Sequence, residues 1–184
     1  MKEIITGQIL MVLCCTVYLV WWYRGFRPGV NVSRVGGING ILLLITAALG
    51  IAGIVMSLRP VQEILKLKAD PMMIAAGGAI AYILLLLVTR YCFQRVVTTE
   101  LSLIVGWAVL EAVVITRLDA AGLLGGSGFF IMCLVLAAAV VISLVLYVAY
   151  YRMEDMKAFY AAMVPLVTEA LAMIILIVMV GRNR

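Results

Sequence analysis

Two glutamates, Glu111 and Glu169, stand inside long apolar stretches of this sequence. If helices cover these stretches, Glu111 lies about three residues, or roughly 4.5 Å of rise, from the middle of its helix, and Glu169 lies close to the middle of the last one. An ionised carboxylate at the centre of a membrane costs on the order of 2.5–3.5 kcal/mol, so such a group faces a helix bundle, binds a proton or has a partner. No lysine or arginine stands near the middle of any apolar stretch. The two acids are therefore the first candidates for a functional site.

A shared cavity is the functional interpretation of these acids. Glu111 and Glu169 would share a proton there, or bind a cation or the ammonium group of a solute. Pro165 supports this interpretation, because it has no N–H to donate to the carbonyl of Ala161 and so predicts a kink and a free acceptor one turn before Glu169. Further oxygens for such a site are available in Tyr18, Asn39, Tyr82 and Thr168.

The helix predicted over residues 99–117 carries a polar stripe. At about 100° per residue, Glu100 and Glu111 fall within roughly 20° of one face, and Trp107 lies on that face between them. We expect Glu100, near the membrane interface, to be a solvated helix end or an access point for a solute. For Trp107 we expect packing inside the bundle, with stacking on a ligand as the alternative.

The structural interpretation of the same acids stays open. Each glutamate would then be neutral, or hydrogen-bonded to a tyrosine, threonine or asparagine of a neighbouring helix, and would serve packing. Hydrogen bonds inside membrane bundles average only about 0.6 kcal/mol, so they need no functional purpose. Two acids at membrane depth without a nearby base favour the functional interpretation.

The composition is that of a membrane protein. The 184 residues are 66% hydrophobic and 12% charged, with a mean hydropathy of +1.21, whereas a soluble domain is roughly 45–50% apolar. A spanning helix needs about 20 apolar residues. The sequence predicts one all-α, polytopic domain over 1–184, a compact bundle of six transmembrane helices over residues 4–23, 36–57, 71–88, 99–117, 128–151 and 159–180.

The ends of the predicted helices carry interfacial residues. The aromatic cluster before Arg24 lacks the small residues of a signal-peptide cleavage site, so we expect the first helix to be retained. Gly36 and Gly40 have the spacing that allows close helix packing in lipid. Residues 58–70 mix charged and apolar side chains and predict an amphipathic connector along the membrane surface.

Orientation and symmetry are only weakly indicated. Lysine and arginine are balanced between the two predicted sides, so the positive-inside rule fixes no orientation. We favour cytoplasmic termini, in the plasma membrane of a bacterium or archaeon. The halves 1–92 and 93–184 would each hold three helices, so a repeat between them would be inverted, as in many transporters. Its traces are glycine pairs before the second and fifth helices and the prolines Pro71 and Pro165, and coincidence is an equal explanation.

Other function classes find no support. The chain has no histidine, its four cysteines have no metal-binding spacing, and it contains no Walker, dinucleotide-binding or G-x-S-x-G motif. We therefore expect no enzyme, no metal and no cofactor. The net charge of +5 comes from lysines and arginines at predicted helix ends, which indicates lipid headgroups and not nucleic acid as partners.

The sequence thus predicts a small transporter or channel that binds a small cationic or amphipathic solute, or a proton, at intramembrane carboxylates. The alternative is a non-transporting membrane subunit, sensor or assembly partner, which would use the Gly36–Gly40 face and the connector from Arg59 to Lys68. The lipid bilayer surrounds the protein in both cases, and a homo-oligomer is compatible with both. A polar cavity bordered by helices 99–117 and 159–180 would favour the first, and a dry core with both acids satisfied would favour the second.

Overall fold

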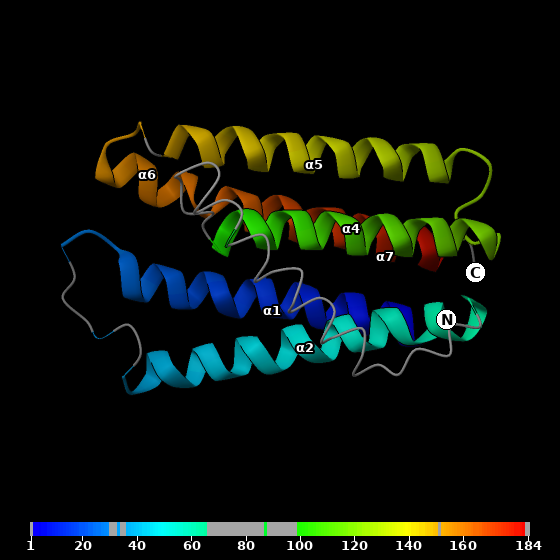
Figure 1. Cartoon of the computed structure of the whole chain (residues 1–184), viewed down its shortest axis with the longest axis horizontal. Helices are drawn as coiled ribbons and strands as arrows, with labels where there is room; N and C mark the ends of the chain where they lie inside the picture. Colours follow the sequence, from blue (N-terminus) through cyan, green and yellow to red (C-terminus); the bar gives the residue numbers. More distant parts are fainter. Residues whose placement is uncertain are drawn as a thin grey trace.

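The computed structural model describes residues 2–29, 33, 36–65, 87, 99–150 and 152–182, and of residues 60–65 and 99–100 it describes the backbone only. These residues form the helices α1 (Lys2–Phe26), α2 (Ile38–Leu65), α4 (Thr99–Ala120), α5 (Gly128–Tyr150), α6 (Asp155–Ala161) and α7 (Val164–Arg182). The long helices lie side by side along one axis (Figure 1).

The described residues contain five helices that are long and apolar enough to cross a membrane, with α6 and α7 counted as one span. This confirms the prediction of an all-helical, multi-pass membrane protein. The predicted third span, 71–88, lies outside the described residues except for Leu87, and so does the part of the predicted surface connector beyond residue 65.

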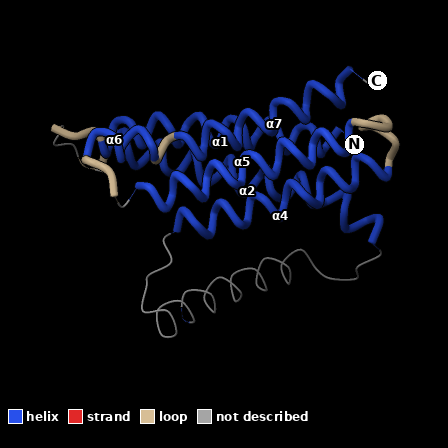
Figure 2. Tube along the Cα trace, turned by 90° about the horizontal axis from the view of Figure 1, so that it is seen from above, coloured by secondary structure: helices blue, strands red, loops and turns tan. Residues whose placement is uncertain are grey.

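Both chain termini lie at one end of the bundle, which we call the terminal end, and α6 lies at the opposite, distal end (Figures 1 and 2). Helix α1 runs from the terminal to the distal end, and α2 returns antiparallel to it, since Gly7 packs against Ser57 and Arg24 binds Asn39. Helix α4 begins in the distal half. It runs from there to the terminal end, parallel to α7 (Figure 1).

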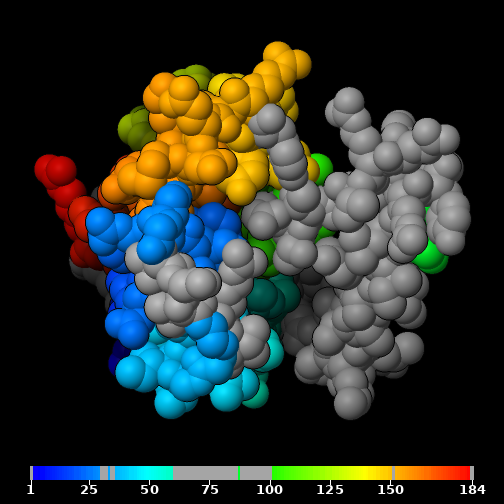
Figure 3. All heavy atoms as spheres, turned by 90° about the vertical axis from the view of Figure 1, so that its left-hand side faces the viewer, coloured from blue at the N-terminus to red at the C-terminus, as the bar shows by residue number. Residues whose placement is uncertain are grey.

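Two helices differ from their predicted form. Helix α2 continues through Pro60 to Leu65, so it is longer than predicted. The last span, predicted as one kinked helix, is divided into α6 and α7 by a turn at Ala162 and Met163. Seen from the distal end (Figure 3), α6 lies beside the end of α1, where the ring centroids of Tyr23 and Phe159 are 6.0 Å apart.

Glycine allows α1 and α2 to approach closely in the terminal half of the bundle. A Cβ atom added to Gly7 would lie 2.8 Å from the carbonyl oxygen of Gly53. Small residues at such contacts are typical of helix pairs in lipid. The predicted pair, Gly36 and Gly40, does not form one helix face, because Gly36 precedes α2 and donates its N–H to Ser33 Oγ at 2.9 Å.

Two apolar clusters fill the space between α1, α4, α5 and α7. The cluster at the terminal end, which we call the apolar plug, consists of Ile4, Val114, Ile115, Leu118, Leu124, Met132, Leu176 and Val180. The central cluster consists of Cys15, Trp107, Ala139, Ala172 and Met173. The outer faces carry exposed apolar side chains such as Leu44 and Phe130, as expected for contact with lipid.

Candidate functional site

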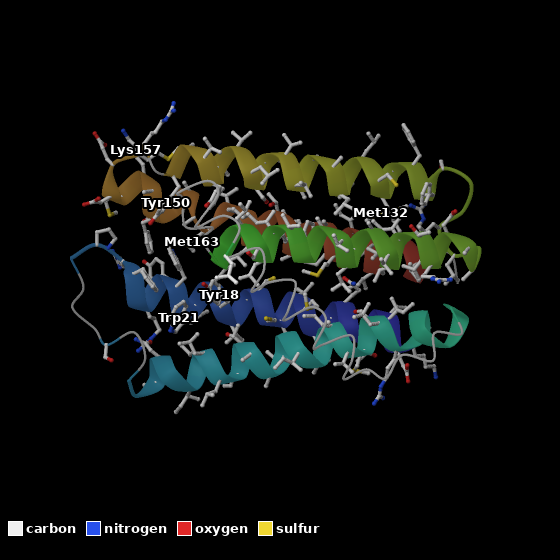
Figure 4. All side chains as sticks on the ribbon, viewed as in Figure 1. Tyr18, Trp21, Met132, Tyr150, Lys157 and Met163 are labelled. Carbon is white, nitrogen blue, oxygen red and sulfur yellow. The ribbon has the colours of Figure 1, made fainter. Side chains whose placement is uncertain are left out.

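A partly open cavity of about 270 Å³ occupies the distal half of the bundle. Four helical segments build it: α1, α4, α5 and the α6–α7 pair. Its lining consists of Tyr18, Trp22, Leu103, Ile104, Leu146, Tyr147, Tyr150, Ala161, Ala162, Pro165, Leu166 and Glu169. Figure 4 shows Tyr18, Tyr150 and Met163 in this half of the bundle, whereas Met132 of the apolar plug lies in the other half.

Glu169 is the one charged residue among the described lining residues of this cavity. Its side chain is 6% exposed and lies farther from the distal end along α7 than Pro165 and Leu166. The carboxyl group is therefore at the inner end of a cavity whose other walls are aromatic and aliphatic. A cavity with many apolar contacts and few polar groups is typical of small-molecule sites.

The break between α6 and α7 forms one wall of the cavity. The N–H of Ala162 donates to the Ala158 carbonyl at 3.0 Å, and the N–H of Met163 donates to the Tyr160 carbonyl at 3.0 Å. Helix α7 then begins at Val164, and Pro165 lies in its first turn, where the missing N–H is tolerated. Because proline cannot donate to the carbonyl of Ala161, the helix cannot run through this point unchanged.

Thr168 connects α7 to its surroundings and is not among the lining residues. Its Oγ1 donates to the Pro165 carbonyl at 2.8 Å and lies 3.4 Å from Ser143 Oγ on α5. Since the Thr168 hydroxyl has one proton, Ser143 is the donor in the second contact. Thr168 thus stabilises the first turn of α7 and its contact with α5.

Glu111 lies behind the cavity, in a second polar layer that it forms with Gln8 of α1. The two side chains are 2% and 1% exposed, and they interact with each other. Among the described residues, neither Gln8 Oε1, Gln8 Nε2 nor Glu111 Oε1 has a hydrogen-bond partner of good geometry. We call these two residues the inner polar layer.

The clusters fix the depth of this layer. Trp107 shares the central cluster with Ala172 and Met173, and Val114 shares the apolar plug with Leu176 and Val180. Helices α4 and α7 run in the same direction, so Glu111 lies one to two turns closer to the terminal end than Glu169, roughly 5–10 Å of rise. The two carboxyl groups still interact electrostatically.

The other predicted site residues lie in different places. Tyr18 lines the cavity together with Glu169, whereas Trp107 is buried in the central cluster. Asn39 lies at the distal end, where its Nδ2 donates to the Ser33 carbonyl at 2.7 Å and its Oδ1 accepts from Arg24 Nε at 3.4 Å. Tyr82 and the side chain of Glu100 lie outside what the structure describes.

Gln8 is the residue that sequence reasoning did not select. It is the amide side chain within the first apolar stretch, and this was the available signal. Its predicted position near the start of a helix does not reveal that the side chain is buried, because a residue there is buried only if neighbouring helices, such as α4 with Glu111, cover it.

Comparison with known protein families, curated proteins and solved structures finds no match to this chain. The length and composition of the helices indicate an integral membrane protein that crosses the bilayer several times. Any more specific function must be argued from the cavity and the layers behind it.

Proposed function

We propose that this protein is a small transporter or channel that binds a small cationic or amphipathic solute in the distal cavity, with Glu169 as the ligand of the positive charge. The observation that carries the proposal is a single carboxylate at the inner end of an otherwise aromatic and aliphatic cavity. A carboxylate in such surroundings gains most from a cation that has its own apolar surface.

The aromatic lining suits an organic ammonium ion. Tyr18, Trp22, Tyr147 and Tyr150 surround the cavity on two sides. An aromatic ring attracts a nearby cation by about 0.5–2 kcal/mol, depending on desolvation, and groups of such rings bind quaternary ammonium ions. Apolar substituents on the nitrogen would contact the aliphatic residues, such as Leu146 and Leu166.

The asymmetry of the bundle supports transport. The cavity occupies the distal half, and the apolar plug fills the terminal half. A transporter that exposes its site to one side at a time has this arrangement in one of its states. The helix break beside the cavity agrees with the discontinuous helices that form transporter sites.

An inverted repeat would give the bundle a basis for alternating between two states. In the described residues, the connection before α2 contains two glycines with positive φ, Gly29 and Gly37, and the connection before α5 contains Gly122 and Gly125. These two connections lie at opposite ends of the bundle, as inversion requires. The two connections are therefore similar in backbone conformation, and this similarity of the loops is what supports an inverted repeat.

Binding of organic cations tests the proposal. In isothermal titration calorimetry of the detergent-purified protein, tetramethylammonium, choline and benzyltrimethylammonium are the probes, and 3,3-dimethylbutan-1-ol is the uncharged analogue of choline. We expect at least one cation to bind more tightly than the alcohol. The variant Glu169→Gln should weaken that binding by about tenfold or more, since it removes the Coulomb attraction between the carboxylate and the quaternary ammonium ion, which amounts to a few kcal/mol in partly desolvated surroundings.

Glu154→Gln is the matched control, because Glu154 is exposed and forms its ion pair with Lys157 outside the cavity. It should leave cation binding unchanged. If no cation binds, or if Glu169→Gln binds as well as the wild type, the proposed site is wrong. Cation binding without flux of the same cation through proteoliposomes would favour the alternative, a non-transporting sensor or subunit.

A further inference from the structure

The inner polar layer has no role in the cavity described above, yet it places an amide and a carboxyl group in the interior of the bundle. Gln8 and Glu111 come from two helices and are almost fully buried. They lie next to the apolar plug, because Glu111 is one turn before Ile115 on α4 and Gln8 is one turn after Ile4 on α1. Three of their polar atoms have no partner of good geometry among the described residues.

Hydrogen-bond chemistry tells which form of Glu111 fits this layer. The Gln8 amide offers N–H donors on one atom and an acceptor oxygen on the other. An ionised carboxylate only accepts, so it could bind Gln8 Nε2 and would leave Gln8 Oε1 unpaired. A protonated Glu111 donates its O–H to Gln8 Oε1 and accepts from Gln8 Nε2, so it satisfies both sides of the amide.

The surroundings of Glu111 supply no base that could stabilise its ionised form. The titratable groups nearest to it in the described residues are Glu169 on α7 and the thiol of Cys15 on α1. Helix α5 contributes the buried hydroxyl of Ser143 and, farther toward the distal end, Tyr147; α2 contributes the Ser57 hydroxyl beside Gly7. On α4 itself, Arg117 lies about 240° around the helix from Glu111 and faces elsewhere.

We propose that Glu111 and Gln8 form an occluded proton site, in which Glu111 keeps a proton bound to the Gln8 amide while Glu169 ionises to bind the solute. The two acids then have separate tasks: Glu111 remains neutral and Glu169 exchanges its proton for a cation. A neutral Glu111 also avoids the repulsion that a second carboxylate would exert on an ionised Glu169. The division of tasks rests on the proposed cation site, whereas the proton site itself does not.

Infrared spectroscopy tests the proton site directly, because a protonated carboxylic acid has a carbonyl stretch that a carboxylate lacks. We expect the wild-type protein to show such a band at neutral pH. Glu111→Gln should remove the part of the band that belongs to Glu111, and the same change in a Glu169→Gln background, where Glu169 cannot contribute, should remove the band entirely. Gln8→Met should keep the band but shift it to higher frequency, since the O–H loses its acceptor. Glu154→Gln, which changes an exposed carboxylate, should leave the band unchanged.

Cation binding provides the second readout. Glutamine has nearly the shape of protonated glutamate and no charge, so Glu111→Gln should bind the cation probes within about threefold of the wild type, whereas Glu169→Gln should not. If the wild type has no protonated-carboxyl band at neutral pH, or if Glu111→Gln keeps that band unchanged, the proton site is wrong. That result would leave the binding test of Glu169 unaffected, and a failed binding test would leave the infrared result intact.

Discussion

Neighbouring polar residues on α7 have different tasks. Glu169 faces the cavity, whereas Thr168 donates to the Pro165 carbonyl and accepts from Ser143. A position next to the proposed cation ligand is therefore no sign of binding. The hydroxyl of Thr168 supports the helix break that forms one wall of the cavity.

Replacing Thr168 by valine should lower stability and spare binding. The variant loses the 2.8 Å bond to Pro165 and the 3.4 Å contact with Ser143, so we expect a loss of about 0.5–1.5 kcal/mol in unfolding free energy. Thermal unfolding in detergent measures this loss, and calorimetry measures cation binding. Thr16→Val is the control, since the exposed Thr16 hydroxyl binds only a carbonyl of its own helix. A binding defect in Thr168→Val without loss of stability would make Thr168 a ligand.

Only part of the site could be predicted from the sequence. Glu111 and Glu169 stand out because a carboxylate in an apolar stretch has a cost that the sequence itself reveals. That Glu169 reaches the cavity and Glu111 lies behind it follows from the faces that α4 and α7 turn toward each other. Local patterns do not contain that information, and the same reason hides Gln8.

At the scale of the helices, the length of each apolar stretch determines where most helices begin and end. Tertiary contacts determine the ends that the apolar stretches do not. Pro60 and Pro165 both interrupt apolar segments, yet α2 continues through Pro60 whereas a turn separates α6 from α7 just before Pro165. A proline removes one backbone hydrogen bond in either place. Whether the helix then bends or breaks depends on its neighbours, which for Pro165 include the open cavity.

The closest helix contact should respond to a single methyl group. Gly7→Ala would place a Cβ atom 2.8 Å from the carbonyl oxygen of Gly53, and we expect α1 and α2 to separate slightly at a cost of about 1–3 kcal/mol. Gly106→Ala is the matched control, because a Cβ at this helical position meets nothing within 4 Å. Thermal unfolding should show a lower midpoint for the first variant and an equal or higher one for the second. Equal midpoints for both would mean that the α1–α2 contact is not tight.

At the scale of the whole molecule, the axis of the bundle divides into three parts: the cavity, the inner polar layer and the apolar plug. This order makes the two ends of the protein unequal. A solute that enters from the distal side would reach Glu169 and then meet the inner polar layer and the buried side chains of the apolar plug. Transport therefore requires the plug to open and the cavity to close, whereas a channel would need an opening through both at once.

Thiol labelling in membrane vesicles distinguishes these cases. In a variant with all four native cysteines replaced, a cysteine at Ala162 in the cavity wall should react with a membrane-impermeant reagent only from the distal side, and choline should slow this reaction if it binds. A cysteine at Leu118, which is 1% exposed within the plug, should not react as long as the protein keeps the arrangement that the structure shows. A tag at the N-terminus identifies the terminal side in the same vesicles.

The pattern of labelling then tells a transporter from a channel. Labelling of Leu118→Cys from the terminal side together with Ala162→Cys from the distal side would indicate that both states are populated, as alternating access requires. Labelling of Ala162→Cys from both sides at equal rates would instead indicate a continuous pore.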